Sequence, residues 1–174
     1  MTTTASDGRL GPRVRVREAE RADLLAVCHI EQESFPQPWP FSAFERFLGE
    51  PGFLVAQVCG PATENPRNPS KVGDDGRVVG YVVADVVPNH GAGIGHVKDL
   101  AVAEACRGER VGTRLLARAL RAMADEGAGS VKLEVRRSND AGRALYEAFD
   151  FERRGTVPRY YDNGEDALVM VRKF

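Results

Sequence analysis

The feature that most constrains the fold is a strand, a helix and a strand in succession in the second half of the chain. Residues 95–102, "GHVKDLAV", read as a strand, and a helix from about Arg110 to Glu126 follows. Its apolar stripe consists of Val111, Leu115, Leu116, Leu120 and Met123. Residues 130–137, "SVKLEVRR", then alternate apolar and polar residues as a strand does. Strands joined through a helix lie parallel, so the sequence predicts a parallel crossover here.

The rest of the chain surrounds this crossover with hairpins. Strands are expected at "VRVREAE", "FLVAQV", "RVVGYVVADVV", "FERRGTVPRY" and "DALVMVRKF". Helices are expected at "AERADLLAVCHIEQESF", "FSAFERFLGE" and "AGRALYEAF", the first two separated by the prolines of "FPQPWP". The sequence therefore predicts an α/β fold with a mixed, mostly antiparallel, twisted sheet of about seven strands flanked by about four helices.

Length and local composition indicate one domain. The 174 residues fit a single folded unit. Residues 1–12 are polar and are expected to form a disordered tail, and residues 13–174 form the domain. Within it, residues 59–77 are rich in Pro, Gly, Asn and Asp, which favours a mobile loop insertion.

Charge and hydropathy exclude several classes of protein. The formal net charge of −1 argues against a protein that binds nucleic acid directly. The chain has no apolar run long enough to span a membrane and begins without the apolar core of a signal peptide, so we expect a cytoplasmic location and no membrane association. The three cysteines, Cys28, Cys59 and Cys106, are expected to be reduced, and none pairs with a histidine at a spacing typical of a metal site.

A glycine-containing segment connects the strand at residues 95–102 to the helix that follows. This segment, "RGERVGT" at residues 107–113, opens a helix, and unpaired N–H groups and the helix dipole attract phosphate at such a position. Gly108 and Gly112 allow close approach of a ligand to the backbone. The alternative is the start of an ordinary amphipathic helix whose arginines form a solvated face, and the segment alone leaves both interpretations open.

In this context "RGERVGT" resembles motif A of the GNAT superfamily of acetyl-CoA-dependent N-acetyltransferases. The family pattern Arg/Gln-x-x-Gly-x-Gly/Ala is met by Arg107 and Gly112, whereas Arg110 replaces the middle glycine. "KLEVRRSNDAGRALYEAFDF", "ESFPQPWP" and "RYYDNGEDALVM" also resemble segments of N-terminal protein acetyltransferases, in particular the ribosomal-protein alanine N-acetyltransferases and their archaeal relatives. The resemblance covers residues 14–174 apart from the loop at about residues 61–76.

The resemblance implies a single GNAT domain that transfers acetyl from acetyl-CoA, its co-substrate, to the N-terminal α-amine of a protein, with a ribosomal protein as one candidate. Transfer would be direct, in a ternary complex, and without a metal. The implied coenzyme site consists of Leu100, Ala101, Val102, Arg107, Gly108, Glu109, Arg110, Val111, Gly112, Thr113 and Asn139. The strands at residues 95–102 and 130–137 would splay apart near Leu100–Val102 to admit the coenzyme.

The resemblance also assigns roles in catalysis. Glu134 would be the general base, His96 a second base and Tyr146 the general acid for the leaving thiolate. Each has a structural alternative: a solvated strand carboxylate, a strand-end histidine and a core aromatic residue, respectively. The slot for the peptide's first residues would be framed by Phe35, Pro36, Tyr160 and Tyr161.

Other functions remain compatible with the sequence. A GNAT enzyme can act on a small-molecule amine or an internal lysine, and Arg110 in place of the glycine leaves room for a coenzyme-A-binding regulatory module without catalysis. The sequence does not determine the protein substrate, its preferred first residue or the oligomeric state.

Overall fold

The structure is a computed structural model that describes residues 13–59 and 76–174. The expected tail at residues 1–12 and nearly all of the expected loop insertion lie outside the described residues. The described strands are β1 (Arg13–Glu18), β2 (Leu54–Cys59), β3 (Arg77–Val87), β4 (Gly93–Val102), β5 (Ala128–Arg136), β6 (Glu152–Val157) and β7 (Ala167–Lys173). The described α-helices are α1 (Leu24–Ser34), α2 (Phe41–Glu45), α3 (Val111–Asp125) and α4 (Asp140–Ala148).

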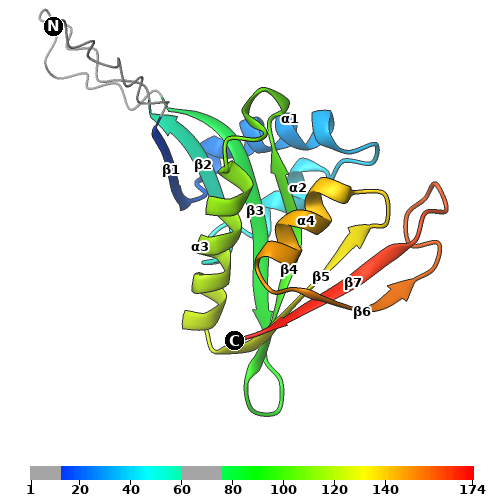
Figure 1. The fold of residues 1–174 in the computed structure, drawn as a ribbon. Coiled ribbons are helices and arrows are strands. Elements are labelled where there is room, and N and C mark those ends of the chain that lie inside the picture. The colour runs from blue at the N-terminus through cyan, green and yellow to red at the C-terminus, as the bar shows by residue number, and fades with distance from the viewer. Residues whose placement is uncertain (1–12, 60–75) are drawn as a thin grey trace, which may run out of the picture.

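The strands form one sheet in the order β1-β2-β3-β4-β5-β7-β6 (Figure 1). Only the β4–β5 pair is parallel among the described strands, and α3 connects these two strands. The predicted crossover and the predicted mixed, mostly antiparallel sheet are therefore confirmed.

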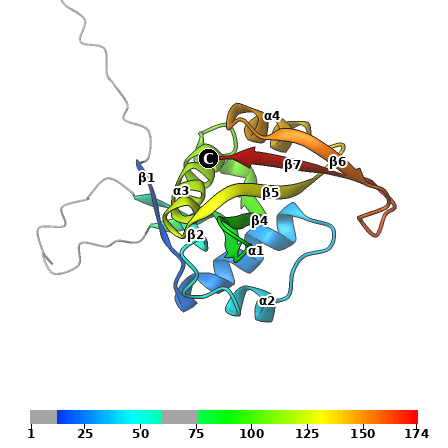
Figure 2. The ribbon, with the colours of Figure 1, turned by 90° about the horizontal axis from the view of Figure 1, so that it is seen from below.

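Helices cover both faces of the sheet. Figure 2 shows α3 and α4 on one face and α1 and α2 on the other. The predicted stripe of α3 is buried against the sheet, with Leu115 and Leu116 fully enclosed. On the opposite face, Leu24 and Val27 of α1 pack with Phe44 of α2. The sheet therefore has two hydrophobic cores, because successive side chains of a strand point to opposite faces.

Several elements have other bounds than the sequence predicts; helix α1, for example, begins at Leu24 and not at Ala19. Helix α2 stops at Glu45, and turns follow it up to Gly52. Helix α3 begins at Val111, since Arg110 has a left-handed backbone with φ of 60°. Strand β6 ends at Val157, because the following Pro158 has no N–H to donate to a ladder.

A β-bulge interrupts β4 at Lys98. Val83 of β3 pairs with Asp99 and its neighbour Ala84 with Val97, so Lys98 is the extra residue. Val97 packs into the core beneath α3, whereas Lys98 approaches the ring of Phe47 on the other face. A bulge breaks the alternation of side chains. Asp99 therefore points to the same face as Lys98 and contacts Tyr81.

Strands β4 and β5 part beyond this point. Their pairing ends at Val97–Leu133, although β4 stays paired with β3 to Val102 and β5 stays paired with β7 to Arg136. Figure 1 shows β5 and β7 turning away from β4 together. The splaying expected near Leu100–Val102 is thus present, and it opens a gap in the middle of the sheet.

The turn that leads into β2 contains Gly52, and substitution of this glycine tests the fold. A Cβ atom on Gly52 would lie 2.3 Å from the carbonyl oxygen of Ala84. We expect Gly52→Ala to lower the free energy of unfolding by about 1–3 kcal/mol in denaturant titrations, because the backbone must shift. Gly155→Ala is the control, since no atom lies within 4 Å of its Cβ position. Equal effects of the two substitutions would contradict this packing.

Candidate functional site

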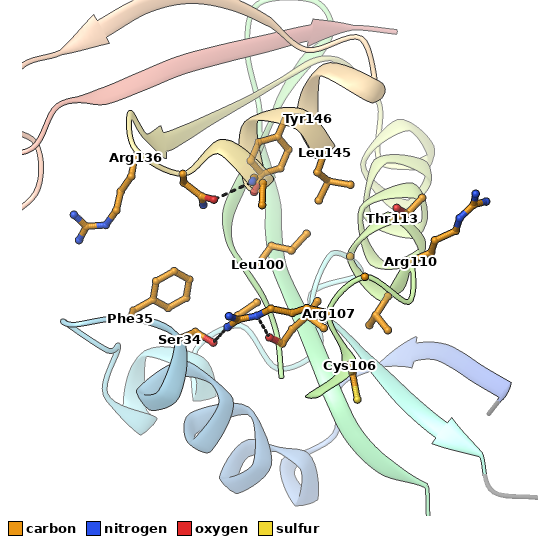
Figure 3. Close-up of a pocket in the computed structure, with 18 of the residues that line it drawn as sticks. Ser34, Phe35, Leu100, Cys106, Arg107, Arg110, Thr113, Arg136, Leu145 and Tyr146 are labelled. Atoms are coloured by element: carbon orange, nitrogen blue, oxygen red, sulfur yellow. Dashed lines mark hydrogen bonds between the residues drawn. The ribbon is translucent and has the colours of Figure 1, made fainter. Parts of the chain in front are cut away.

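A cavity of about 690 Å³ occupies the gap between β4 and β5 (Figure 3). This volume lies in the range of small-molecule and cofactor sites. Every residue of the predicted coenzyme site except Glu109 lines it, as do Phe35, Pro36 and Tyr146. The sequence analysis did not include its remaining lining residues, which are Ser34, Cys106, Arg136, Ala141, Gly142, Leu145, Asn163 and Glu165.

The backbone of β4 presents hydrogen-bonding groups to this cavity. The N–H of Ala103 donates to the carbonyl of Val79 at 2.8 Å. Hydrogen-bonded pairs of an antiparallel ladder recur at every second residue, so Ala101 also bonds to β3, and Leu100 and Val102 direct their N–H and C=O groups toward the gap. Consistently, the Val102 carbonyl accepts a 3.0 Å hydrogen bond from Arg107 Nε. An extended ligand that contains amide groups can pair with this edge.

The N-terminus of α3 forms one wall of the cavity. Gly108 and Arg110 both have positive φ, 80° and 60°, and no side chain caps the helix. Its first N–H groups are therefore available to an anion. Figure 3 shows the guanidinium of Arg110 directed away from Leu100 and Tyr146. The left-handed backbone at this position explains why glycine suits it in the motif, and Arg110 keeps the conformation without filling the cavity.

Helix α4 closes the cavity from the other side. The Asn139 side chain caps this helix by accepting a 2.9 Å hydrogen bond from the N–H of Gly142, and it also lines the cavity. Tyr146 is buried, packs edge-on against Phe151, and borders the cavity near Leu100 (Figure 3). Burial, and then the charges of Asp99 and Tyr161, raise the pKa of Tyr146 above its usual value. Its hydroxyl is therefore protonated at neutral pH and can donate a proton.

Glu134 and His96 meet beside the cavity. Glu134 Oε2 lies 2.6 Å from His96 Nε2, and the two side chains project from adjacent strands. The hydrogen bond from His96 lowers the pKa of Glu134; burial opposes this effect, and the charges of His96 and Lys132 add to it. Lys98 Nζ lies 3.5 Å from His96 Nδ1. Since an ionised carboxylate only accepts, Nε2 of His96 carries the hydrogen that Glu134 receives.

Tyr160 and Tyr161 lie in the β6–β7 loop, next to this pair. Their rings meet edge-on at 5.0 Å, and the Arg136 guanidinium lies 3.7 Å from the centre of the Tyr161 ring. Burial raises the pKa of Tyr161 to about 12, and the charge of Glu134 contributes to the raised pKa of both tyrosines. Neither tyrosine lines the cavity between β4 and β5.

A salt bridge that the sequence analysis missed holds this loop in place. Arg136 Nη1, at the end of β5, lies 3.1 Å from Glu165 Oε2. Hydrogen bonds from the Ser138 hydroxyl and N–H, followed by Arg136, lower the pKa of Glu165 to about 2. In the sequence, only the arginines of "RRSND" at the end of a strand hint at such a salt bridge. They do not identify Glu165, which lies 29 residues from Arg136, as the partner.

No described helix is long and apolar enough to cross a membrane. Within residues 13–59 and 76–174, no group of three or more His, Cys, Asp or Glu side chains is arranged to hold a metal ion. Cys28 and Cys106 are free thiols, and the side chain of Cys59 lies outside the described part.

Residues 24–151 match the model of the Acetyltransferase (GNAT) family. An uncharacterized N-acetyltransferase from Methanocaldococcus jannaschii is 34% identical over 161 residues, which cover 91% of this chain and 90% of that protein. An N-alpha-acetyltransferase from Sulfolobus acidocaldarius is 32% identical over 169 residues, 90% of each chain. The crystal structure of the ribosomal-protein-S18-alanine N-acetyltransferase from Escherichia coli superposes with a TM-score of 0.71 at 27% identity, covering 92% of this chain and 94% of that one. The chain therefore belongs to the GNAT acetyltransferase family.

The geometry of the α3 N-terminus predicts that substitutions at Arg110 and Gly112 differ in their effect on coenzyme A binding. Arg110→Gly should raise the free energy of unfolding by about 0.5–1 kcal/mol, because glycine adopts a positive φ without strain. It should leave coenzyme A binding within roughly tenfold, about 1.4 kcal/mol. Gly112→Val should fold, since its Cβ would lie 3.4 Å from Leu145 Cδ2, an ordinary contact. It should weaken binding far more by filling space in the cavity.

Thermal unfolding and calorimetry with coenzyme A measure both effects. If Arg110→Gly weakened binding more than Gly112→Val, the Arg110 side chain rather than the backbone would hold the phosphates.

Proposed function

We propose that this protein is an acetyl-CoA-dependent acetyltransferase that acetylates the N-terminal α-amine of a protein. The observation that carries the proposal is that an ionised Glu134, hydrogen-bonded to His96, and a protonated Tyr146 lie on the elements that flank the gap between β4 and β5. The names of the relatives from S. acidocaldarius and E. coli support an α-amine as the acceptor. The residues of the site fit the coenzyme, since they offer unpaired backbone groups and an uncapped helix N-terminus.

Acetyl-CoA supplies the acetyl group as a thioester, which is activated toward an amine. The N–H groups at residues 110–113 would hold its phosphates, and the inward-facing groups of Leu100 and Val102 would hold the amide-containing arm. The Leu100 N–H can also donate to the thioester oxygen as negative charge develops there. Tyr146 then donates its proton to the departing sulfur. This arrangement needs no nucleophilic side chain of the protein.

Glu134 is the better placed of the two candidate bases. Nε2 of His96 is already engaged with Glu134, and its Nδ1 lies 3.5 Å from the Lys98 ammonium. Oε1 of Glu134 faces Lys132 at 3.6 Å and remains accessible. An α-amine has a pKa of about 7.7–8.0, against about 10.4 for lysine, so a fraction is already neutral at pH 7. Glu134 then accepts the proton that the amine loses as the new bond forms.

The substrate class is tested with two peptides. A peptide that begins with alanine or serine should be acetylated on its α-amine, and a peptide with a blocked N-terminus and free lysines should react far more slowly. Phe35 and Pro36 line the cavity together with Asn163 and Glu165 of the β6–β7 loop. Mass analysis of the modified amine gives the answer. Equal rates would instead favour a lysine or small-molecule acetyltransferase.

The catalytic roles are tested by three substitutions. Glu134→Gln should lower kcat by about 10²–10⁴, the range of lost acid–base catalysis. His96→Ala should lower it less, because the histidine only donates to Glu134. Tyr146→Phe should lower kcat at all moderate pH values and leave coenzyme affinity nearly unchanged.

The pH profile identifies which group titrates. kcat/KM should rise with pH through the pKa of the substrate amine, about 8. A peptide whose α-amine has a lower pKa should shift this rise in kcat/KM to lower pH. Near-full activity of Glu134→Gln together with inactive His96→Ala would reverse the assignment of the base.

A further inference from the structure

Arg136 lies at the end of β5, where the coenzyme cavity meets the β6–β7 loop, and the chemistry above does not use it. Its Nη1 lies 3.1 Å from Oε2 of Glu165 and donates to Oδ1 of Asn163 at 3.3 Å. Its guanidinium carbon lies 3.7 Å from the centre of the Tyr161 ring. A single side chain therefore contacts three residues of this loop.

The ion pair of Arg136 with Glu165 is more shielded than a neighbouring pair on the same loop. The two side chains are only 20% and 21% exposed. Arg137 pairs with Asp166 at 3.1 Å, but those side chains are 54% and 32% exposed. Exposed ion pairs contribute little because water screens them, whereas shielded charges interact more strongly. Arg136 therefore holds the loop more firmly than Arg137 does.

Glu165 fastens the loop to the start of α4 as well. Its Oε1 accepts hydrogen bonds from the hydroxyl of Ser138 and from the Ser138 N–H, the latter at 2.8 Å. Ser138 precedes Asn139, the N-cap residue of α4, which lines the coenzyme cavity. Both carboxylate oxygens of Glu165 are thus bound to the segment that connects β5 to α4.

Backbone hydrogen bonds within the loop extend this hold to the tyrosines. The N–H of Tyr161 donates to the carbonyl of Glu165 at 3.1 Å, and the N–H of Gly164 donates to the carbonyl of Tyr161 at 2.8 Å. Tyr160 is 51% exposed, and its ring meets the Tyr161 ring edge-on. Glu165 therefore fixes the backbone of Tyr161, and Arg136 supports its ring.

The position of Arg136 argues against a role in holding the coenzyme phosphates. An arginine that lines a cofactor cavity can bind phosphate through its guanidinium group. Figure 3, however, shows Arg136 on the same side of the cavity as Phe35, whereas Arg110 and Thr113 at the N-terminus of α3 lie on the other side. The guanidinium group of Arg136 also already faces the carboxylate of Glu165.

The loop that Arg136 holds lies near the candidate base. Glu134 is close enough to Tyr160 and Tyr161 for its charge to act on both phenols. Arg136 follows Glu134 by two residues on β5, so the two side chains leave the same face of the sheet. The acceptor amine has to reach Glu134, so a peptide that delivers it passes close to both tyrosines.

We propose that Arg136 is a positioning residue for the acceptor peptide: together with Glu165 it holds the Tyr161 ring at the peptide slot, and it acts through that ring. The proposal rests on the acetyltransferase function above and on a peptide slot that includes Tyr160 and Tyr161. It gives Arg136 no part in proton transfer or in coenzyme binding.

Kinetics of Arg136→Met test this role, because methionine removes the charge and keeps an unbranched side chain. The KM for a peptide with a free N-terminus should rise about five- to tenfold, as expected from the loss of a cation–π contact and a shielded ion pair. kcat and the Kd of coenzyme A should stay within about twofold of the wild-type values. Arg136→Lys should recover most of the KM, since an ammonium group can still pair with Glu165 and approach the ring.

Arg137→Met is the matched control, because it removes the neighbouring ion pair to the same loop and should leave the KM unchanged. An unchanged KM in Arg136→Met would overturn the proposal. Weaker binding of coenzyme A with an unchanged KM would assign Arg136 to the coenzyme site instead.

A double variant tests whether Arg136 acts through Tyr161. In a Tyr161→Leu background, Arg136→Met should raise the KM by less than about twofold, because substitutions of residues in contact are not additive. If Arg136→Met raised the KM by the same factor with and without Tyr161, the proposed route through the ring would be wrong.

A second measurement is independent of activity. Hydrogen exchange at the N–H groups of Tyr161 and Gly164 should be faster in Arg136→Met than in the wild type and in Arg137→Met, because the loop opens more readily. Unchanged exchange would overturn the proposal even if acetyl transfer is observed. If the wild type acetylated no amine but exchange rose as expected, the proposed function would fail while the hold of Arg136 on the loop stood.

Discussion

The site depends on the separation of β4 from β5 after Val97 and Leu133. Each strand keeps its outer neighbour, so the sheet stays intact while Leu100 and Val102 lose partners on one side. Backbone N–H and C=O groups without a strand partner along this edge can bind a ligand that has matching amide groups. The N-terminus of α3 and the first turn of α4 lie at the same gap and shape it into a cavity.

The local environment sets opposite protonation states in Glu134 and Tyr146. Glu134 is held ionised by a hydrogen bond from His96 and by Lys132, whereas Tyr146 is held protonated chiefly by burial. One group can therefore accept a proton while the other donates one, as an acyl transfer to an amine requires. This pairing favours an enzyme over a regulatory module that only binds the coenzyme.

Arg110 shows how a departure from a motif can leave its geometry intact. The motif glycine serves a left-handed backbone position, and Arg110 adopts that conformation with φ of 60°. Its side chain points away from the cavity, so the space for a pyrophosphate is kept (Figure 3). What changes is the local strain, which affects stability more than binding.

The sequence by itself determined the crossover, the buried stripe of α3 and the position of "RGERVGT", because these follow from local periodicity and from the chemistry of a helix N-terminus. The family resemblance predicts that Glu134, His96 and Tyr146 act in one site. Only the tertiary structure decided the bulge at Lys98, the salt bridge of Arg136 with Glu165 and the contact of Tyr81 with Asp99. Each of these is a contact between residues far apart in the chain. No local pattern encodes it, because the partner is chosen by how the strands and helices pack.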